Sequence, residues 1–266
     1  MDASNKAEIG IIGGTGVYSA DLFGADKLVK IYTPFGEPSD LINIGEYAGR
    51  KIAFIPRHGR NHTIPPHRIN NRANIWALRD LGVTRIIAPS AVGSLKREFK
   101  PGDIAIPHQF IDFTKSRRYT FYDGGEICHI STADPFCSDL SSLVKDCSIR
   151  LNYVAHPEVT YLCIEGPRFS TRAESHLFRN MGADVIGMTV VPECILAREA
   201  QICYVSISTI TDYDVWTESQ VSSSDILEVL KKNVDKTRRL IKQIIPLVPD
   251  ERLNCSCGHA LEGSLL

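Results

Sequence analysis

The sequence contains no apolar run long enough to cross a membrane. A spanning helix needs roughly 18 to 20 consecutive apolar residues, and the best candidates here are interrupted by Pro89, Gly93 and Pro192. The opening residues, Met-Asp-Ala-Ser-Asn-Lys, also lack the basic and then apolar plan of a secretory signal. We therefore expect a cytoplasmic protein that has no membrane partner.

An excess of charge of one sign is also missing. Lys and Arg total 30 against 31 Asp and Glu, and no block of five or six like charges occurs. A general nucleic-acid surface would need a basic excess, so no nucleic-acid partner is expected. With 43% hydrophobic and 23% charged residues in 266, the composition is that of a folded globular protein and excludes disorder, collagen and coiled coils.

Strand patterns alternate with helix patterns along the chain, which predicts an α/β fold. No repeat or linker interrupts them, so we expect one domain over residues 1–266, with a core at about 8–245 and an irregular tail at about 246–266. The capping box Thr171-x-x-Glu174 predicts a helix that carries Leu177, Phe178 and Met181 on one face. Strands are predicted at 8–13, 51–56, 85–89, 159–164, 185–187 and 203–210, and further helices at 68–81, from 192 and from about 224 to 245.

Eight cysteines are present, and most are expected to be inert. The tail carries Cys255-x-Cys257 with His259 nearby, which suits a disulfide, a metal cluster or a disordered end. Zinc needs a fourth ligand that the tail does not offer, so we expect no metal and favour the disulfide. The other six lie on or beside predicted core elements, where buried thiols are usual: Cys128, Cys137, Cys147, Cys163, Cys194 and Cys203.

Two motifs that follow predicted strands suit an anion. Gly13-Gly14-Thr15-Gly16 brings backbone N–H groups together, but it completes neither a dinucleotide fingerprint nor a P-loop, so a simple tight turn stays open. Arg57-His58-Gly59-Arg60 offers a guanidinium fork and an imidazole at a strand end, where α/β proteins bind ligands. The alternative is a solvated basic loop. His62 and His67 follow, without a recognised metal-ligand spacing.

The segment Asp212-Tyr213-Asp214 follows the last predicted strand. Two carboxylates at this spacing can point to the same side and act as an acid/base pair. They also suit a metal-binding acidic triplet, or they cap the loop, which is the commonest role of a loop Asp. A divalent metal would need more oxygen ligands than these two supply.

The order of the motifs is more specific than any one of them. The three segments above, together with Ser90-Ala-Val-Gly-Ser94, Glu165-Gly-Pro-Arg-Phe-Ser170 and Gly187-Met-Thr189, resemble the 5'-methylthioadenosine phosphorylases of the purine nucleoside phosphorylase superfamily. The resemblance runs from about residue 8 to residue 245. It implies a single-domain nucleoside phosphorylase fold, in which a central mixed β-sheet is flanked by helices.

The same resemblance implies phosphorolysis: inorganic phosphate, as co-substrate, attacks C1' of methylthioadenosine and releases adenine. No cofactor or metal is implied. The partners are the nucleoside, phosphate and further copies of the chain, in a trimer or a dimer of trimers. Alternatives are a broader purine nucleoside phosphorylase acting on adenosine or inosine, a nicotinamide-dependent oxidoreductase using the Gly-rich turn, and a non-catalytic nucleoside-binding protein.

Roles for individual residues also follow from the resemblance. Asp212 faces N7 of the base, Asp214 faces the 6-amino group, and His58 completes the catalytic set. An ionised Asp214 favours a 6-amino group, which is a donor, over a 6-oxo acceptor. The phosphate ligands are Thr15, Arg57, His58, Ser90, the backbone N–H of Ala91, and Thr189. The nucleoside contacts are Phe169, Ser170, Met188, Asp212, Tyr213 and Asp214, and the 5'-methylthio pocket comprises Ser224, Leu227 and His129 from a neighbouring subunit.

Two positions depart from the family pattern. Ser224 stands where many members have Val, which makes the expected 5' pocket more polar and weakens selection against a hydroxyl. Ser90 replaces the usual Thr, but its hydroxyl is retained, so phosphate binding is expected to be retained too.

Overall fold

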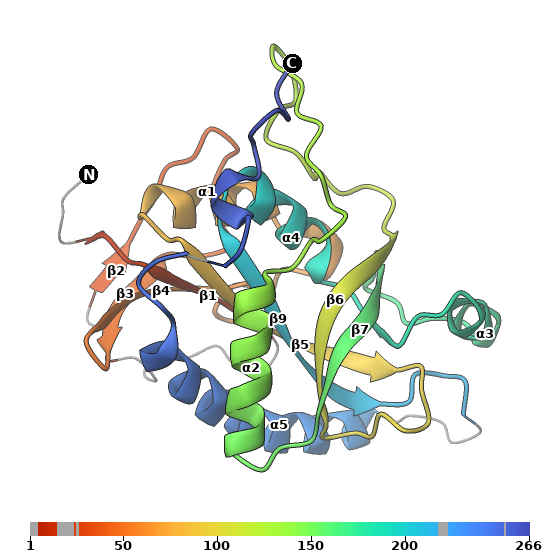
Figure 1. Cartoon of the computed structure of the whole chain (residues 1–266). Helices are drawn as coiled ribbons and strands as arrows, with labels where there is room; N and C mark the ends of the chain where they lie inside the picture. Colours follow the sequence, from red (N-terminus) through yellow and green to blue (C-terminus); the bar gives the residue numbers. More distant parts are fainter. Residues whose placement is uncertain (1–4, 15–23, 25–26, 218–222, 253) are drawn as a thin grey trace.

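The structure is a computed structural model that describes residues 5–14, 24, 27–217, 223–252 and 254–266, with residues 223–228 and 230 described by their backbone alone. Figure 1 shows a sheet that runs through the molecule with helices on both sides. The strands are β1 (Ile9–Gly13), β2 (Lys27–Val29), β3 (Ile42–Tyr47), β4 (Arg50–Pro56), β5 (Arg85–Ser94), β6 (Ile104–Phe113), β7 (Ala155–Ile164), β8 (Val185–Gly187) and β9 (Cys203–Asp212).

The sheet is mixed and partly closed. Its order is β2-β3-β4-β1-β5-β8-β7-β6-β9, and β9 also pairs with β5, so that five strands form a ring. Strands β4, β1, β5 and β9 pair in parallel, whereas β5 with β8 and β6 with β9 are antiparallel. The carboxyl ends of the parallel strands therefore meet at one edge, where α/β proteins place their ligands.

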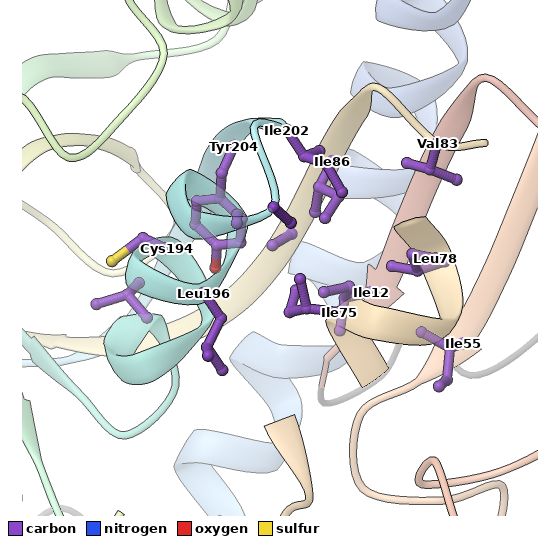
Figure 2. Close-up of a cluster of buried hydrophobic side chains, with 14 of the residues drawn as sticks. Ile12, Ile55, Ile75, Leu78, Val83, Ile86, Cys194, Leu196, Ile202 and Tyr204 are labelled. Atoms are coloured by element: carbon purple, nitrogen blue, oxygen red, sulfur yellow. The ribbon is translucent and has the colours of Figure 1, made fainter. Parts of the chain in front are cut away.

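The two faces of this sheet are covered by α1 (Asn71–Asp80), α2 (Ser138–Arg150), α4 (Val190–Glu199) and α5 (Ser223–Ile244). A further helix is α3 (Arg172–Asn180), and short 3-10 turns are η3 (Pro66–Arg68), η4 (Ile245–Leu247) and η5 (Cys257–His259). Buried side chains of α1 and α4 form one core cluster with the sheet, and those of α2 and α5 form another. Figure 2 shows the first cluster, where Ile75 and Leu78 of α1 lie near Ile12 and Ile86 of the sheet.

The predicted α/β fold with a mixed central sheet is confirmed, and several boundaries differ. Helix α1 begins three residues later than predicted because the Asn70 side chain accepts the Ala73 N–H and caps it there. Strands β2, β3 and β6 were not predicted. In β6, Pro107 lies where the pairing with β7 shifts register, and a proline inside a strand argues against a strand in the sequence.

Helix α3 stands apart from the layered core (Figure 1). Its capping box forms as predicted, with Thr171 and Glu174 each accepting the other's backbone N–H. Its apolar face, however, is only partly covered: Phe178 is buried, whereas Leu177 is 50% and Met181 43% exposed. Within the described part of the chain, no helix is both long enough and apolar enough to cross a membrane.

Candidate active site

A cavity of about 620 Å³ opens at the carboxyl ends of the parallel strands. Arg57 and His58 follow β4 directly, Asp212 ends β9, and Thr189 precedes α4. The strand ends thus bring together side chains that are far apart in the sequence. The predicted site residues that line this cavity are Arg57, His58, Ser90, Ala91, Phe169, Ser170, Met188, Thr189, Asp212 and Asp214.

Arg57 is a fully buried cation at the wall of the cavity. Its Nε and Nη2 donate to the Glu193 carboxylate, with Nη2 at 3.0 Å from Oε2, and Nη1 donates to the Pro89 carbonyl at 2.9 Å. Burial alone would lower the pKa of Arg57, but the negative charge of Glu193 more than offsets this and raises it. Within the described residues, one of the N–H groups on Nη1 and one on Nη2 have no partner and can bind an anion.

His58 is buried beside Arg57 and is neutral at physiological pH. Burial, and then the positive charge of Arg57, lower the pKa of His58 to about 4. Its Nδ1 lies 2.9 Å from the Ile64 carbonyl oxygen, which can only accept, so Nδ1 carries the proton. Nε2 is then an acceptor, suited to the hydroxyl of a hydrogen phosphate. A bound dianion would favour protonation, which turns Nε2 into a donor.

His58 is therefore expected to make the ligand-free protein sensitive to acid. Because its folded-state pKa lies below the unfolded value of 6.5, its contribution to stability is complete above pH 6.5 and is lost as the pH falls toward 4. His58→Asn keeps a side-chain N–H for Ile64 but does not titrate. Between pH 6.5 and 4 the melting temperature of the natural protein should fall more steeply than that of the variant. Parallel curves would contradict the assignment.

Hydroxyls and close-packed backbone complete this part of the cavity. The buried Ser90 hydroxyl lies 3.1 Å from that of Ser208, in a group of serines on β5 and β9. The Gly14 backbone lies close to the Pro89 carbonyl and to Arg57. A Cβ at Gly14 would overlap that carbonyl and lie 2.8 Å from Nη1 of Arg57. Thr189 precedes α4 and lines the cavity, but Val191 is not helical, so the backbone beside Thr189 is not a regular helix N-terminus. The arrangement suits phosphate.

Two partly or fully buried carboxylates lie farther along the strands, since Asp212 pairs with Gly93, three residues beyond Ser90 on β5. Asp212 Oδ1 accepts the Asp214 N–H at 2.7 Å, and Oδ2 accepts the Thr211 hydroxyl at 2.7 Å. Burial raises the pKa of Asp212, and these hydrogen bonds only partly offset the shift. The loop-capping role that the sequence left open is thus real, and Asp212 lines the cavity as well.

Asp214 is buried as well, and burial raises its pKa. The Ser175 and Ser170 hydroxyls lie near enough to offset part of this shift. Within the described residues, however, neither hydroxyl nor Oδ2 of Asp214 makes a hydrogen bond of good geometry. Buried polar atoms of this kind are costly unless a partner is supplied. Asp214 and Ser170 line the cavity, so a polar ligand group can supply it.

Apolar side chains also line the cavity. Met188 and the 63% exposed Phe169 lie along the cavity. Gly187, at the end of β8, has no side chain because the Tyr161 hydroxyl occupies the place of its Cβ. That hydroxyl lies 3.4 Å from the Thr189 Oγ1. The lining therefore offers apolar contacts as well as polar groups to a ligand.

The remaining predicted site residues lie elsewhere or cannot be placed. Tyr213 does not line the cavity; its hydroxyl donates to the Arg97 carbonyl and its ring contacts Trp216 edge to face. His129 is exposed and its N–H donates to the Ser264 carbonyl at 2.8 Å, away from the cavity lining. Three predicted residues fall outside the description, Thr15 entirely and Ser224 and Leu227 in their side chains.

Glu193 and Tyr204 are site residues that the sequence reasoning missed. Glu193 is fully buried, binds Arg57, and accepts the Tyr204 hydroxyl at 2.8 Å. Glu193 stands alone as an acid in the otherwise apolar run Val190-Val-Pro-Glu-Cys-Ile-Leu-Ala197. A single charge in a buried helix needs a partner of opposite sign, and that signal identifies Glu193 in retrospect.

The expected disulfide in the C-terminal tail is not found. All eight are free thiols, so the structure contains no Cys255–Cys257 disulfide. His259 does not join them; its Nδ1 lies 2.7 Å from the Glu262 carboxylate. Cys137 and Cys203, expected to be inert core thiols, instead lie beside the tail cysteines.

Comparison with known proteins shows to which family the chain belongs. The family model described as "Phosphorylase superfamily" matches residues 8–246. The chain belongs to the phosphorylase superfamily. Among curated members of the superfamily, the S-methyl-5'-thioadenosine phosphorylase of Nitrosopumilus maritimus is 58% identical over 96% of this chain and 97% of its own length.

The fold of this chain is also similar to solved structures in the superfamily. A methylthioadenosine phosphorylase from an Antarctic soil metagenomic library superposes with a TM-score of 0.94 at 44% identity, covering 98% of this chain and 93% of that one. A single-residue mutant of the adenosine/methylthioadenosine phosphorylase from Schistosoma mansoni, in complex with methylthioadenosine, has a TM-score of 0.90 at 36% identity, covering 97% and 96%.

Proposed function

We propose that the protein catalyses phosphorolysis of S-methyl-5'-thioadenosine to adenine and 5-methylthioribose 1-phosphate, with phosphate as co-substrate and no metal or organic cofactor. The observation that carries this proposal is that one cavity is lined by anion-binding groups, by two carboxylates and by apolar side chains. The naming of similar proteins as methylthioadenosine phosphorylases supports it.

Beside the anion-binding groups, phosphate is both the nucleophile and an electrostatic stabiliser. Arg57 supplies two N–H groups, Ser90 and Thr189 supply hydroxyls, and His58 accepts the phosphate hydroxyl or, once protonated, donates. As the glycosidic bond breaks, positive charge develops on the ribose ring, and an adjacent anion lowers its energy. Phosphate held in this way attacks C1'.

Beside the two carboxylates, negative charge develops on the departing adenine. Asp212, whose pKa burial raises, is placed to protonate or hydrogen-bond N7. Asp214 Oδ2 and the Ser170 hydroxyl lack hydrogen bonds of good geometry in the described residues and suit the donor and acceptor edge of adenine. A 6-oxopurine would set its carbonyl against a carboxylate and is disfavoured.

We also propose that the active form is a trimer or a dimer of trimers. The apolar face of α3, with Leu177 and Met181, is left exposed by the residues that the structure describes. His129 lies outside its own cavity lining, as a residue given to a neighbour would. These observations support a site completed between subunits, where His129, Ser224 and Leu227 would enclose the 5' group.

The decisive experiment is adenine release from methylthioadenosine, measured with and without inorganic phosphate. Phosphate-dependent release with one sugar phosphate formed per adenine is expected. Release without phosphate would mean a hydrolase, and binding without turnover would mean a nucleoside-binding protein. Adenosine and inosine are measured in parallel, because the Schistosoma mansoni relative is named for both adenosine and methylthioadenosine. Comparable rates on adenosine would favour a broader purine nucleoside phosphorylase.

A further inference from the structure

Four of the eight cysteine sulfurs converge at one place remote from the cavity described above. Cys137 directly precedes α2, Cys203 opens β9, and Cys255 and Cys257 belong to the C-terminal segment around η5. Their Sγ atoms all lie within 4.8 Å of one another. The group, called here the four-cysteine cluster, therefore joins three separate parts of the chain.

The spacing of the sulfurs matches a tetrahedral metal centre. A Zn–S bond of about 2.3 Å places the four sulfurs of a zinc tetrathiolate about 3.8 Å apart. Cys203 and Cys255 are 3.5 Å apart, whereas a disulfide would need about 2.05 Å. Each sulfur lies near all three others, as four ligands of one ion do, rather than in two separate pairs.

The surroundings suit a closed, structural site. Cys137, Cys203 and Cys257 are buried and belong to the core cluster that includes α2 and α5. The backbone is held locally, since the Cys137 N–H donates to the Tyr204 carbonyl at 2.9 Å. Gly258 has no side chain where the Arg252 guanidinium packs: a Cβ there would lie 3.0 Å from its Cζ.

An ion has a route to the cluster. Cys255 and Cys257 line a second cavity of about 470 Å³, whose lining includes the cations Lys145 and Arg198 and the acids Asp134 and Glu158. Because these charges balance, the lining does not add negative charge to four thiolates around Zn²⁺, which carry a net charge of −2. Thiolate ligands select Zn²⁺ over hard ions such as Mg²⁺ and Ca²⁺.

We propose that Cys137, Cys203, Cys255 and Cys257 form a structural site for one Zn²⁺ ion. This reverses the expectation of no metal, because the ligands that the tail lacks come from α2 and β9. Each thiol gives its proton to solvent on binding, and no oxidant or reductant is needed. The ion would tie the C-terminal segment to the core, ahead of the pairing of Leu266 with Ile127.

The test begins with the full chain purified under a thiol reductant without added chelator. Elemental analysis should find about one zinc per chain. Replacing zinc by Co²⁺ should give the thiolate charge-transfer and tetrahedral ligand-field bands, saturating at one equivalent. The double variant Cys255→Ser/Cys257→Ser should lose both signals, and its melting temperature should fall toward that of the natural protein treated with chelator.

Cys147→Ser is the matched control, because Cys147 is a buried thiol on α2 outside the cluster. It should keep the metal and the Co²⁺ spectrum. Two results would overturn the proposal even if the variants fail to fold. One is natural protein that binds neither zinc nor Co²⁺ while eight thiols react with Ellman's reagent after denaturation. The other is denatured natural protein in which Ellman's reagent finds four thiols before reduction and eight after it, which would mean two disulfides.

Discussion

Replacing Asp212 by Asn is expected to lower kcat for methylthioadenosine by about 100- to 10,000-fold, the range for loss of a general acid. The amide still donates a hydrogen bond to N7 but cannot transfer a proton. Because burial raises the pKa of Asp212, kcat of the natural enzyme should fall as the pH rises through that pKa. Asp212→Asn should lack this fall. Its ratio of inosine to methylthioadenosine turnover should rise, since an amide NH2 beside N7 can also donate to the neighbouring 6-oxo group, whereas a carboxylate repels it.

The fold is expected to survive this substitution. The Asn oxygen can accept the Asp214 N–H, and its NH2 can donate to the Thr211 hydroxyl, which then donates to the Val92 carbonyl 3.1 Å away. A carboxyl whose folded-state pKa is raised contributes stability at low pH that is lost as the pH rises through that pKa. At neutral pH, Asp212→Asn should therefore melt at or above the temperature of the natural protein.

Asp112→Asn is the control for this pair of measurements. Oδ1 of Asp112 accepts the N–H of Thr114, two residues ahead, at 2.8 Å, just as Oδ1 of Asp212 accepts the N–H of Asp214. Unlike Asp212, however, Asp112 is exposed and does not line the cavity. Its activity should match that of the natural enzyme. Asp212→Asn with near-natural kcat, or with an unchanged ratio between the two purine classes, would show that Asp212 does not assist the leaving base.

Much of the fold and of the candidate site could be predicted from local sequence patterns. The buried strands ending at Gly13 and Pro56 are continuous apolar runs, and polar motifs directly after such runs must lie at a strand end. Strand β3 was not predicted because its apolar pattern ends at Ile44 and is followed by Gly45 and the exposed Glu46. The apolar face of α3 was predicted, but periodicity shows only that a face is apolar and not what covers it.

Contacts between distant residues could not be predicted in the same way. The pairing of Arg57 with Glu193, 136 residues away, depends on β4 and α4 meeting in three dimensions. The four-cysteine cluster depends likewise on the tail returning to α2 and β9. Spacing rules for metal ligands assume that ligands lie near one another in sequence. They fail here because the third and fourth sulfurs come from the core.

Replacing Arg57 by Ala is expected to raise the KM for phosphate by about 10- to 150-fold and to change the KM for the nucleoside little. A hydrogen-bonded charge is worth roughly 1.5 to 3 kcal/mol, which corresponds to that factor. Arg57→Ala also leaves the buried Glu193 carboxylate without its cation. Loss of one partner of a buried pair costs about 3 to 5 kcal/mol of unfolding free energy, so the melting temperature should fall as well.

The double variant Arg57→Met/Glu193→Gln separates these two effects. It removes both charges, nearly preserves side-chain volume, and keeps an acceptor for the Tyr204 hydroxyl. Its stability should return most of the way to that of the natural protein, since uncharged replacements of a buried pair are close to neutral. The raised KM for phosphate should remain. If phosphate affinity instead recovers along with stability, Arg57 holds the fold together and does not bind the nucleophile, and the anion site has to be sought among Ser90, Thr189 and the Gly-rich turn.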